Sequence, residues 1–459
     1  MKRTKQLFKS TIVLTGTKFI TQAINFFLLP LYTNLLTTSE YGTIDVLFTI
    51  ILVGVPIFTL QIEMGVFRYY IIENDNKRNV VTTGFIVILV NMILLSIPVF
   101  LLGTRWFETL YALFICVMIA AEGVNALMLQ LCRAKGDNLG YGLCSTIISI
   151  IKSGLCVISV GLMGLRIRGY LLGALIAQII GIIILFFRSK VWLDFNWKNF
   201  DKQYASRIIK YSVPLVFNQM ASWIVNFSDR IIIAAYLGLG DNGIYSAASK
   251  LSNMILGVMA MFNLAWTENV TRNLNNKGNQ DYIAEALMNF IRVILLCVAV
   301  LIGILPCFFN ILIGVDFYES YNHVPILLLA MAFSGIAAFL GSVYTAYGKT
   351  TQIAVTTIFA AVINLIIDLL FITKIGLYAA SLSTLISFFA LALIRYCFMR
   401  KFIQIRIANS GIMPIVVITL FIGIFYYLKF TVGSVIFALI LIYYAMKMAY
   451  PFLRKNTRH

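Results

Sequence analysis

The chain has 459 residues, of which 61% are hydrophobic and 12% are charged, and its formal net charge is +18. Soluble proteins have about a quarter of their residues charged, so this composition excludes a soluble globular enzyme. The positive charge does not indicate a nucleic-acid partner, because Lys and Arg concentrate in loops on one predicted side of a membrane.

Apolar runs of 18 or more residues recur along the whole chain, which is typical of a polytopic membrane protein. Hydrocarbon offers no partner for backbone N–H and C=O groups, so the spans are expected to be helices; the short alternating strands of a barrel are not seen in the sequence. We therefore predict an all-α fold with about 14 transmembrane helices of roughly 20 residues each. Their expected limits are residues 11–36, 42–70, 80–102, 108–132, 141–164, 168–187, 209–237, 243–268, 283–305, 324–347, 352–373, 376–399, 410–428 and 431–450.

The loops predict the orientation of the chain. Residues 1–9 and the C-terminal tail are basic, whereas residues 34–41 and 306–323 contain no Lys or Arg. By the positive-inside rule, both termini and the basic loop after the sixth span face the cytoplasm. Residues 1–9 are not expected to begin a removable signal peptide, because no small-residue cleavage site follows. The basic loop contains Arg188, Lys190, Lys198, Lys202, Arg207 and Lys210.

This central loop divides the spans into two similar halves. Residues 9–11 read Lys-Ser-Thr before the first span, as residues 210–212 read Lys-Tyr-Ser before the seventh. Six spans on each side make the halves a parallel repeat, in which both begin on the same side. We predict an N-terminal lobe (1–200), a C-terminal lobe (201–405), and two extra helices with a basic tail (406–459).

The stretch at residues 211–268 is the most informative. Two apolar spans are joined by a Gly-rich turn; they contain the adjacent pair Asp229 and Arg230 and, further on, Lys250. Each charge within a membrane helix costs about 2.5–3.5 kcal/mol on insertion scales. A hairpin that keeps three such residues indicates a hydrophilic pathway inside the membrane.

Polar side chains share one face in several spans, at steps of three and four residues. We predict that they surround a wet, locally cationic cavity for an anionic headgroup, above all phosphate. The bases expected to bind the headgroup are Lys18, Lys152, Arg230, Lys250 and Arg292. Candidates for pairing with these bases, or for coupling to an ion, are Asp45, Glu63 and Asp229; Glu122 and Asp368 are further interior acids. Polar residues expected to line the cavity are Gln22, Asn25, Asn218, Ser222, Asn226 and Asn253.

Purely structural roles for these polar and charged residues stay open. Ser, Thr and Asn in membrane helices often only join helices by hydrogen bonds. Lys18, Lys250 and Arg292 lie about two turns from a span end, so their long side chains can instead extend to the interface, and Arg395 is expected to do so. A proline within each of the first two spans, Pro30 and Pro56, predicts a bend that is either a static kink or a hinge.

No catalytic or metal site is expected. The two histidines, His323 and His459, lie in a predicted outer loop and the tail, and the seven cysteines stand singly in apolar runs. A Gly-Lys-Thr at 348–350 lacks the spacing and the preceding strand of a nucleotide-binding loop. We therefore expect no enzymatic reaction, no cofactor and no metal, with transport driven by an ion gradient, the membrane potential or the substrate gradient.

The two hairpins resemble those of the polysaccharide repeat-unit (Wzx-type) flippases. The resemblance includes the layout of about 14 spans and the basic central loop, and it is carried by Glu40, Tyr41, Gly42, Asp229, Arg230, Gly238, Gly243, Tyr245 and Lys250. These flippases belong to a superfamily that also contains MATE drug exporters and lipid II flippases. The resemblance implies two six-helix lobes in a V, alternating access, and a bacterial cytoplasmic membrane.

The resemblance also implies the substrate and partners. The substrate would be an undecaprenyl-diphosphate-linked oligosaccharide for O-antigen, capsule or a related polymer, with the headgroup in the cationic cavity and the lipid tail against the last two spans. Membrane lipid, a polymerase and other surface-polysaccharide assembly proteins would be partners of a monomer. The arginine set of lipid II flippases is incomplete in the first two spans, where Lys18 stands alone, and this favours the repeat-unit branch.

Three alternatives are weighed against this function. A cation-coupled small-molecule exporter of the MATE type predicts a smaller, more acidic cavity, and a lipid II flippase predicts a different saccharide. A membrane glycosyltransferase or polymerase is disfavoured, because the longest connection, near residues 191–206, has about 20 residues and no room for a catalytic domain.

Overall fold

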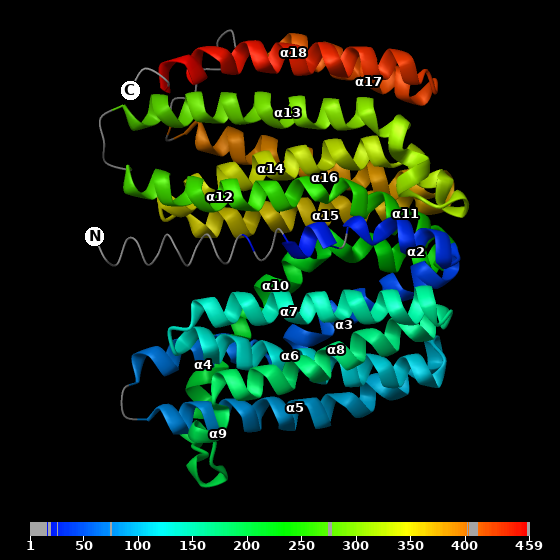
Figure 1. The fold of residues 1–459 in the computed structure, drawn as a ribbon. Coiled ribbons are helices and arrows are strands. Elements are labelled where there is room, and N and C mark those ends of the chain that lie inside the picture. The colour runs from blue at the N-terminus through cyan, green and yellow to red at the C-terminus, as the bar shows by residue number, and fades with distance from the viewer. Residues whose placement is uncertain are drawn as a thin grey trace. The chain divides into compact units, whose positions relative to one another are not determined.

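A computed structural model describes residues 16, 20–24, 26–73, 76–273, 278–401, 403 and 412–456. Within these ranges every regular element is a helix, so the all-α prediction is confirmed (Figure 1). Nine of the described helices are long and apolar enough to cross a membrane, and two shorter apolar helices follow near the C-terminus. The protein is a multi-pass membrane protein.

The chain divides into two compact units, Met1–Ala234 and Ala235–His459. Unit 1 contains α2 (Leu29–Leu35), α3 (Thr38–Thr59), α4 (Ile62–Ile72), α5 (Lys77–Trp106), α6 (Thr109–Ala134), α7 (Asn138–Val157), η1 (Ile158–Leu162), α8 (Arg166–Ser189), α9 (Val191–Asp194), η2 (Trp197–Asn199) and nearly all of α10 (Lys202–Tyr236). Unit 2 contains α11 (Leu239–Ser252), α12 (Met254–Arg272), α13 (Asn279–Leu312), η3 (Val315–Asn322), α14 (Val324–Ala346), α15 (Thr350–Ile375), α16 (Leu377–Met399), α17 (Ile412–Tyr427) and α18 (Thr431–Asn456).

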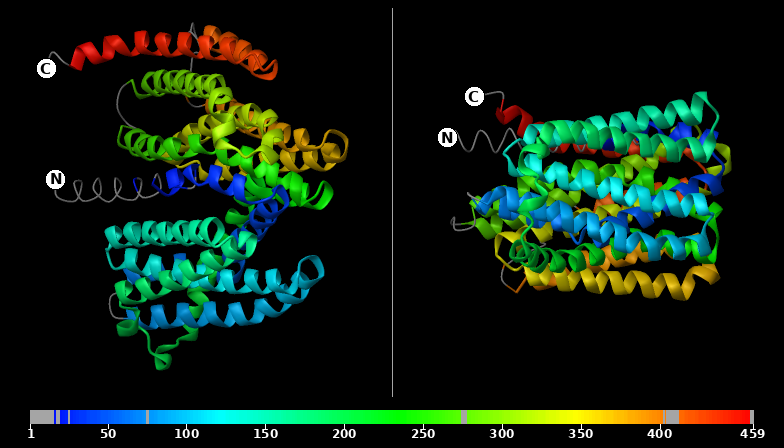
Figure 2. Two further views of the ribbon diagram at one scale, coloured as in Figure 1. Left: turned by 45° about the vertical axis from the view of Figure 1, so that its right-hand side comes forward. Right: turned by 90° about the horizontal axis from the view of Figure 1, so that it is seen from below.

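Helix α6 forms the centre of unit 1, where it packs against α3, α4, α5, α7 and α8 (Figure 2). Glycines allow close approach: a Cβ on Gly54 of α3 would clash with Cδ1 of Ile119 in α6. Helix α3 begins at a capping box, in which the Thr37 hydroxyl accepts from the N–H of Glu40 and the Glu40 carboxylate accepts from the N–H of Thr37. The capping box defines the residue at which α3 begins; further along α3, Phe48 and Asp45 contact α7, α8 and α10.

The predicted second span is two helices, not one. Pro56 interrupts the hydrogen bonding of α3, and four residues later Leu60 and Gln61 adopt the left-handed conformation, with φ of 49° and 56°. Helix α4 then starts in a new direction. Pro30, by contrast, stands in the first turn of α2, where a missing N–H is tolerated.

The strain at this break can be relieved. A residue with a Cβ in the left-handed region is disfavoured by about 1–2 kcal/mol, and glycine is not. We expect Gln61→Gly to raise the free energy of unfolding by up to about 1 kcal/mol, measured by thermal unfolding in detergent. Leu52→Gly, at an exposed helical position of α3, is the control and should lower it by a similar amount. A loss of stability in both variants would contradict the strained break.

In unit 2, α14 is central and packs against α11, α12, α13 and α16, while α17 and α18 pack against α13. The predicted eighth span is also interrupted: α11 ends at Ser252 and α12 begins at Met254, with Asn253 between them. The arginine expected to reach the interface, Arg395, does not. Its side chain is buried and donates to the carbonyl of Ala337 at 2.7 Å, so Arg395 joins α16 to α14.

That expectation was wrong because the position of a residue along a span does not show which neighbouring helix its side chain packs against. Arg395 also donates to the hydroxyls of Thr356 and Thr357 in α15, at 3.1 and 2.9 Å. These acceptors replace the hydrogen bonds that the guanidinium would make to water, so the group can be buried inside the protein.

His323 predicts a pH dependence of stability. It is buried just before α14, its Nδ1 lies 3.0 Å from the Ser381 hydroxyl, and burial lowers its pKa from 6.5 to about 4. The unfolded chain therefore binds this proton at higher pH than the folded chain, and stability should fall as pH decreases from about 6.5 to about 4, by up to about 3 kcal/mol. In thermal unfolding scans, the stability difference between the wild type and His323→Gln should shrink over this pH range; a constant difference would contradict the prediction.

Candidate functional site

One face of α3 gathers the charged and aromatic groups of unit 1. Tyr41, Asp45 and Phe48 follow one another at steps of four and three residues, so they share that face. Tyr41 and Asp45 are buried and Phe48 is half-buried. Helices α7, α8 and α10 supply the groups that meet these side chains.

Arg230 of α10 forms an ion pair with Asp45. The Nη1 of Arg230 lies 2.8 Å from Oδ1 of Asp45, and the two side chains are 12% and 6% exposed. The guanidinium also lies over the ring of Phe227, 5.2 Å from its centroid. The second carboxylate oxygen of Asp45 is buried without a hydrogen-bond partner among the described residues. The arginine is thus compensated by an acid 185 residues away, and not by its sequence neighbour Asp229.

Lys152 of α7 reaches the same face of α3 one turn further on. Its ammonium lies 4.0 Å from the centroid of the Phe48 ring, a cation–π contact. The Phe48 ring packs edge-on against Tyr170 of α8, with 5.8 Å between the ring centroids. Tyr170 packs in the same way against Tyr32 of α2, with 5.2 Å between the centroids. Two bases from separate helices therefore meet one face of α3, where Lys152 contacts Phe48 and Arg230 pairs with Asp45. We call this group of residues the α3 site: Tyr32, Tyr41, Asp45, Phe48, Lys152, Tyr170 and Arg230.

A polar network joins the α3 site to the interior of unit 1. Glu122 of α6 interacts electrostatically with Lys152 and accepts a hydrogen bond from Nε2 of Gln178 at 3.2 Å. The Gln178 side-chain oxygen accepts in turn from Nδ2 of Asn125 at 2.6 Å. Lys152 thus lies between the Phe48 ring and the half-buried acid Glu122.

The structure places other predicted site residues of unit 1 elsewhere. Glu63 is buried in the first turn of α4, beyond the break at Leu60 and Gln61, and is not among the residues of the α3 site. Asp229 is buried beside Arg230.

Asn226 is exposed and donates to the carbonyl of Ser222, which is exposed too. Gln22 is half-buried. Outside the described residues lie Lys18, Asn25 and the side chain of Asn218.

The predicted bases of unit 2 occupy two helices. Lys250 is half-buried in the last turn of α11, three residues before the break at Asn253, whose N–H donates to the carbonyl of Ser249. Arg292 is half-buried on α13 and donates to the side chain of Asn289 at 3.1 Å.

Unit 2 also contains a fully buried acid. Asp368 of α15 accepts a hydrogen bond at 2.6 Å from the Ser383 hydroxyl of α16, which accepts from Nδ2 of Asn364 at 3.2 Å. Asp368 and Asn364 stand four residues apart on one helix face and are 0% exposed. Carboxylate, amide and hydroxyl oxygens are ligands that hard cations prefer.

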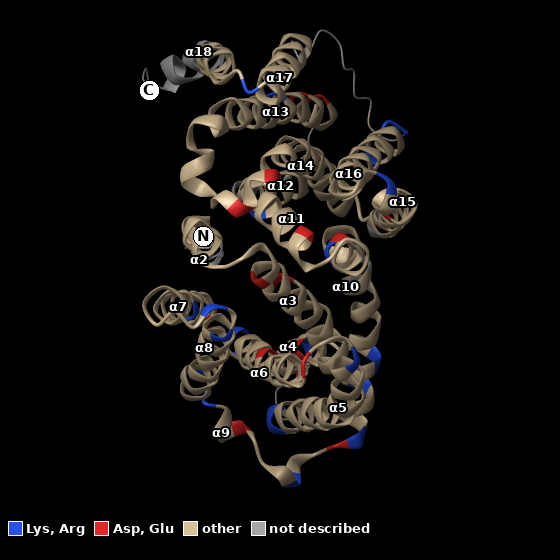
Figure 3. Ribbon diagram, turned by 90° about the vertical axis from the view of Figure 1, so that its right-hand side faces the viewer, with Lys and Arg blue, Asp and Glu red and all other residues tan. Residues whose placement is uncertain are grey.

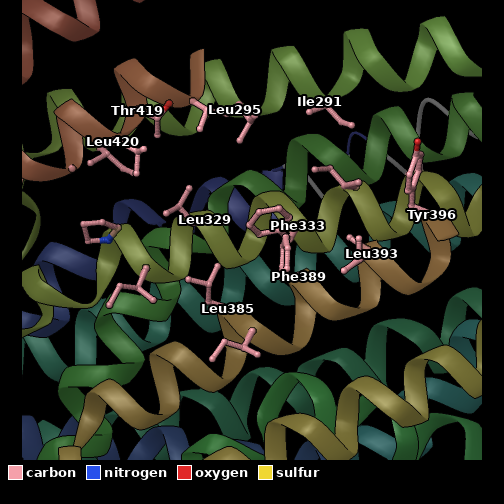
Figure 4. A pocket seen from close by; sticks show the side chains of 18 of the residues that line it. Ile291, Leu295, Leu329, Phe333, Leu385, Phe389, Leu393, Tyr396, Thr419 and Leu420 are labelled. Carbon is pink, nitrogen blue, oxygen red and sulfur yellow. The ribbon is translucent and has the colours of Figure 1, made fainter. Parts of the chain in front are cut away.

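An apolar pocket of about 1030 Å³ opens in unit 2 between α13, α14, α16 and α17 (Figure 4). Its walls are aliphatic and aromatic, with Phe333 and Phe389 in contact at its centre. Among the described residues that line it, hydroxyls come from Thr419, Tyr396 and Tyr427, and none of these lining residues is charged. Such a pocket solvates hydrocarbon and excludes a charged headgroup.

Comparison with known proteins identifies the family. A model of the family described as "Polysaccharide biosynthesis protein" matches residues 7–267, more than half of the chain. The chain belongs to this family. A search of curated proteins gives no match.

Solved structures show the fold that this polysaccharide biosynthesis protein adopts. A lipid II flippase MurJ in an inward closed conformation is similar, with a TM-score of 0.76 at 15% identity, covering 96% of this chain and 100% of that one. An inward-facing multidrug resistance MATE family transporter of the MOP superfamily has a TM-score of 0.66 at 14% identity, covering 87% and 97%. A MOP superfamily transporter from Pyrococcus furiosus has a TM-score of 0.54 at 14% identity, covering 86% and 96%. These similarities show that the chain has the helical fold of these transporters.

Sequence reasoning missed the aromatic half of the α3 site in this family member. Phe48 stands three residues after Asp45, which is the helical spacing that would have included it, but an apolar residue in an apolar span gives no signal of its own. Tyr170 and Tyr32 come from helices distant in sequence. The pocket of unit 2 is built from ordinary span residues and likewise has no sequence signature.

Proposed function

We propose that the protein is a flippase that moves undecaprenyl-diphosphate-linked oligosaccharide repeat units across the bacterial cytoplasmic membrane, for O-antigen, capsule or another surface polysaccharide. Membership of a polysaccharide biosynthesis family and the transporter fold support this function. Alternating access without bond chemistry is the mechanism that fits such a fold.

The observation that carries the proposal is the convergence of Lys152 and Arg230 on one face of α3, beside aromatic rings. A diphosphate can accept charge-assisted hydrogen bonds from both bases, replacing the Asp45 carboxylate at Arg230 and the Phe48 ring at Lys152. The faces of Phe48 and Tyr170 offer apolar surface against which a sugar ring can pack. Lys18, Lys250 and Arg292 are proposed as further headgroup ligands.

The lipid tail is proposed to occupy the apolar pocket between α13, α14, α16 and α17. A polyisoprenyl chain has no hydrogen-bonding group, so it loses no hydrogen bond when it enters a pocket whose described lining residues carry no charge. Helix α17 belongs to the two extra C-terminal helices for which a role against the tail was expected.

Ion coupling is proposed to use the buried acids. Asp45 is engaged by Arg230, which leaves Glu63 and Asp229 among the predicted candidates, and Asp368 with its oxygen-rich neighbours joins them. If Asp368 holds the coupling cation or proton, Asp368→Asn should abolish the dependence of transport on an imposed gradient while gradient-free exchange continues. Ser387→Ala, at a buried hydroxyl one turn further along α16 from Ser383, is the control and should leave gradient dependence unchanged.

A lipid II flippase is the second candidate, because the apolar pocket would suit any polyisoprenyl diphosphate. A small-molecule exporter is the third, favoured by the shared MATE fold alone. The three differ in the substrate that moves, so a direct assay of substrate movement separates them.

The test is a flipping assay in proteoliposomes, with the leaflet of a labelled headgroup read by a membrane-impermeant reagent. Repeat-unit lipid diphosphate should flip, lipid II should flip more slowly, and Lys152→Gln should lower the repeat-unit rate at least about tenfold, because one charge-assisted hydrogen bond is lost. Lys374→Gln, at an exposed lysine of α15, is the matched control. Export of cationic drugs without lipid flipping would contradict the proposal.

A further inference from the structure

The connection between α8 and α10, residues 190–201, is folded firmly onto unit 1. The Thr82 hydroxyl of α5 accepts from the N–H of Asn196 at 3.1 Å, and the Thr83 hydroxyl accepts from the N–H of Asp201 at 3.2 Å. Both threonines lie in the first two turns of α5. The connection therefore holds a fixed depth beside the start of a membrane-spanning helix.

The connection begins where a candidate membrane span ends. The preceding candidate span ends at Ser189, and Lys190, with a left-handed φ of 50°, turns the chain from α8 into α9. Figure 1 shows α9 at the margin of unit 1, beside α5 and α8, with which it is in contact. The chain thus ends its candidate span at Ser189, turns at Lys190 and continues beside α5.

Large apolar side chains point away from the protein along this connection. Their exposed fractions are far above those of core residues: Trp197 67%, Leu193 57%, Trp192 42% and Phe200 40%. Phe187, just before the connection at the end of α8, is 64% exposed. The rings lie in two groups, which together we call the aromatic row: Trp192 contacts Phe186 and Phe187, and Trp197 contacts Phe195. Such a row is unfavourable in water, and tryptophan is enriched where membrane meets water.

Positive charge accompanies the aromatic row. The acids of the connection are occupied within the protein: Asp194 pairs with Lys135 at 2.5 Å, and Asp201 accepts from the N–H groups of Gln203 and Tyr204. Figure 3 shows Lys and Arg positions in blue along the ribbon near α9. The exposed lysines of the connection take part in none of the ion pairs found in the described ranges: Lys190, Lys198 and Lys202.

We propose that residues 190–202 form an in-plane membrane anchor that binds the headgroups of anionic phospholipids. The aromatic row sets the depth, and the three lysines then lie at the level of lipid phosphates. Charge complementarity selects an acidic lipid over a zwitterionic one. This inference does not depend on what the protein transports.

The test uses the full chain in bilayers that contain brominated phosphatidylglycerol or brominated phosphatidylcholine at equal mole fraction. In a Trp106→Phe, Trp223→Phe, Trp266→Phe background, fluorescence reports on Trp192 and Trp197 alone. We expect the anionic lipid to quench about twofold more strongly than the zwitterionic one, and the preference to disappear in a Lys190→Gln, Lys198→Gln, Lys202→Gln variant. Cross-linking of a photoreactive phosphatidylglycerol to peptides covering residues 189–203 in the wild-type chain gives the same readout if the tryptophan variants fold poorly.

The matched control removes three other exposed lysines, all in unit 2: Lys374→Gln, Lys401→Gln and Lys429→Gln. It should keep the anionic preference at Trp192 and Trp197, which shows that local and not total charge matters. Equal quenching by both lipids would overturn the proposal, as would strong quenching by aqueous iodide with little by either lipid. The latter result would indicate a surface open to water or to a protein partner.

Discussion

Replacing Arg230 by alanine is expected to abolish surface polysaccharide and to lower the free energy of unfolding by about 3–5 kcal/mol. The large effect follows because Asp45, 6% exposed, would be left as an unpaired charge inside unit 1. The transport loss follows because the proposed diphosphate ligand disappears. Surface polymer in a complemented deletion strain and thermal unfolding of the purified protein measure the two effects separately.

A double variant separates structure from function. Asp45→Asn with Arg230→Gln removes both charges and keeps two hydrogen-bonding side chains of similar shape, so stability should recover most of the loss. Transport should stay low, since no cation is available for phosphate at this position. Normal polymer in the double variant would mean that the ion pair has only a structural role.

Replacing Gly423 by phenylalanine is expected to reduce transport at least about tenfold while the protein still folds. Gly423 lines the apolar pocket of unit 2, and a Cβ added there meets no atom within 4 Å, so a side chain can start from this position toward the pocket. The ring would occupy space proposed for the lipid tail. The flipping assay in proteoliposomes measures the effect, and binding of a polyisoprenyl diphosphate should weaken in parallel.

The control is Gly154→Phe in α7, a second helical glycine with open space around its Cβ position. It adds the same apolar ring to unit 1, outside the pocket, and should leave transport near the wild-type rate. Equal transport by the Gly423 variant and the wild type would show that the pocket does not hold the tail.

The helical fold could be predicted from the sequence, because a long apolar run in hydrocarbon can satisfy its own backbone N–H and C=O groups only as a helix. The charged members of the α3 site could be predicted too, since Asp45, Lys152 and Arg230 are conspicuous in apolar spans. Their pairing could not. Arg230 stands beside Asp229 in the chain, yet its ion pair is with Asp45, because adjacent residues on a helix point about 100° apart.

The breaks within spans were the least predictable feature. Pro56 predicts a bend in α3, but the chain turns at Leu60 and Gln61, and neither residue type is common in turns. Asn253 interrupts the eighth span without a proline or a glycine beside it. In both cases tertiary packing overrides local preference, and for the same reason Arg395 lies inside unit 2 and not at the interface.

The neutralised state of the α3 site has a kinetic consequence. Arg230 is paired with Asp45 and Lys152 lies beside Glu122, so each positive charge is offset by a nearby acid and little net attractive field extends from the site. Loading rates should then vary little with added salt, unlike those of electrostatically steered ligands. Selection among anionic headgroups would occur after the headgroup has reached the site, when it replaces the acids that neighbour Arg230 and Lys152.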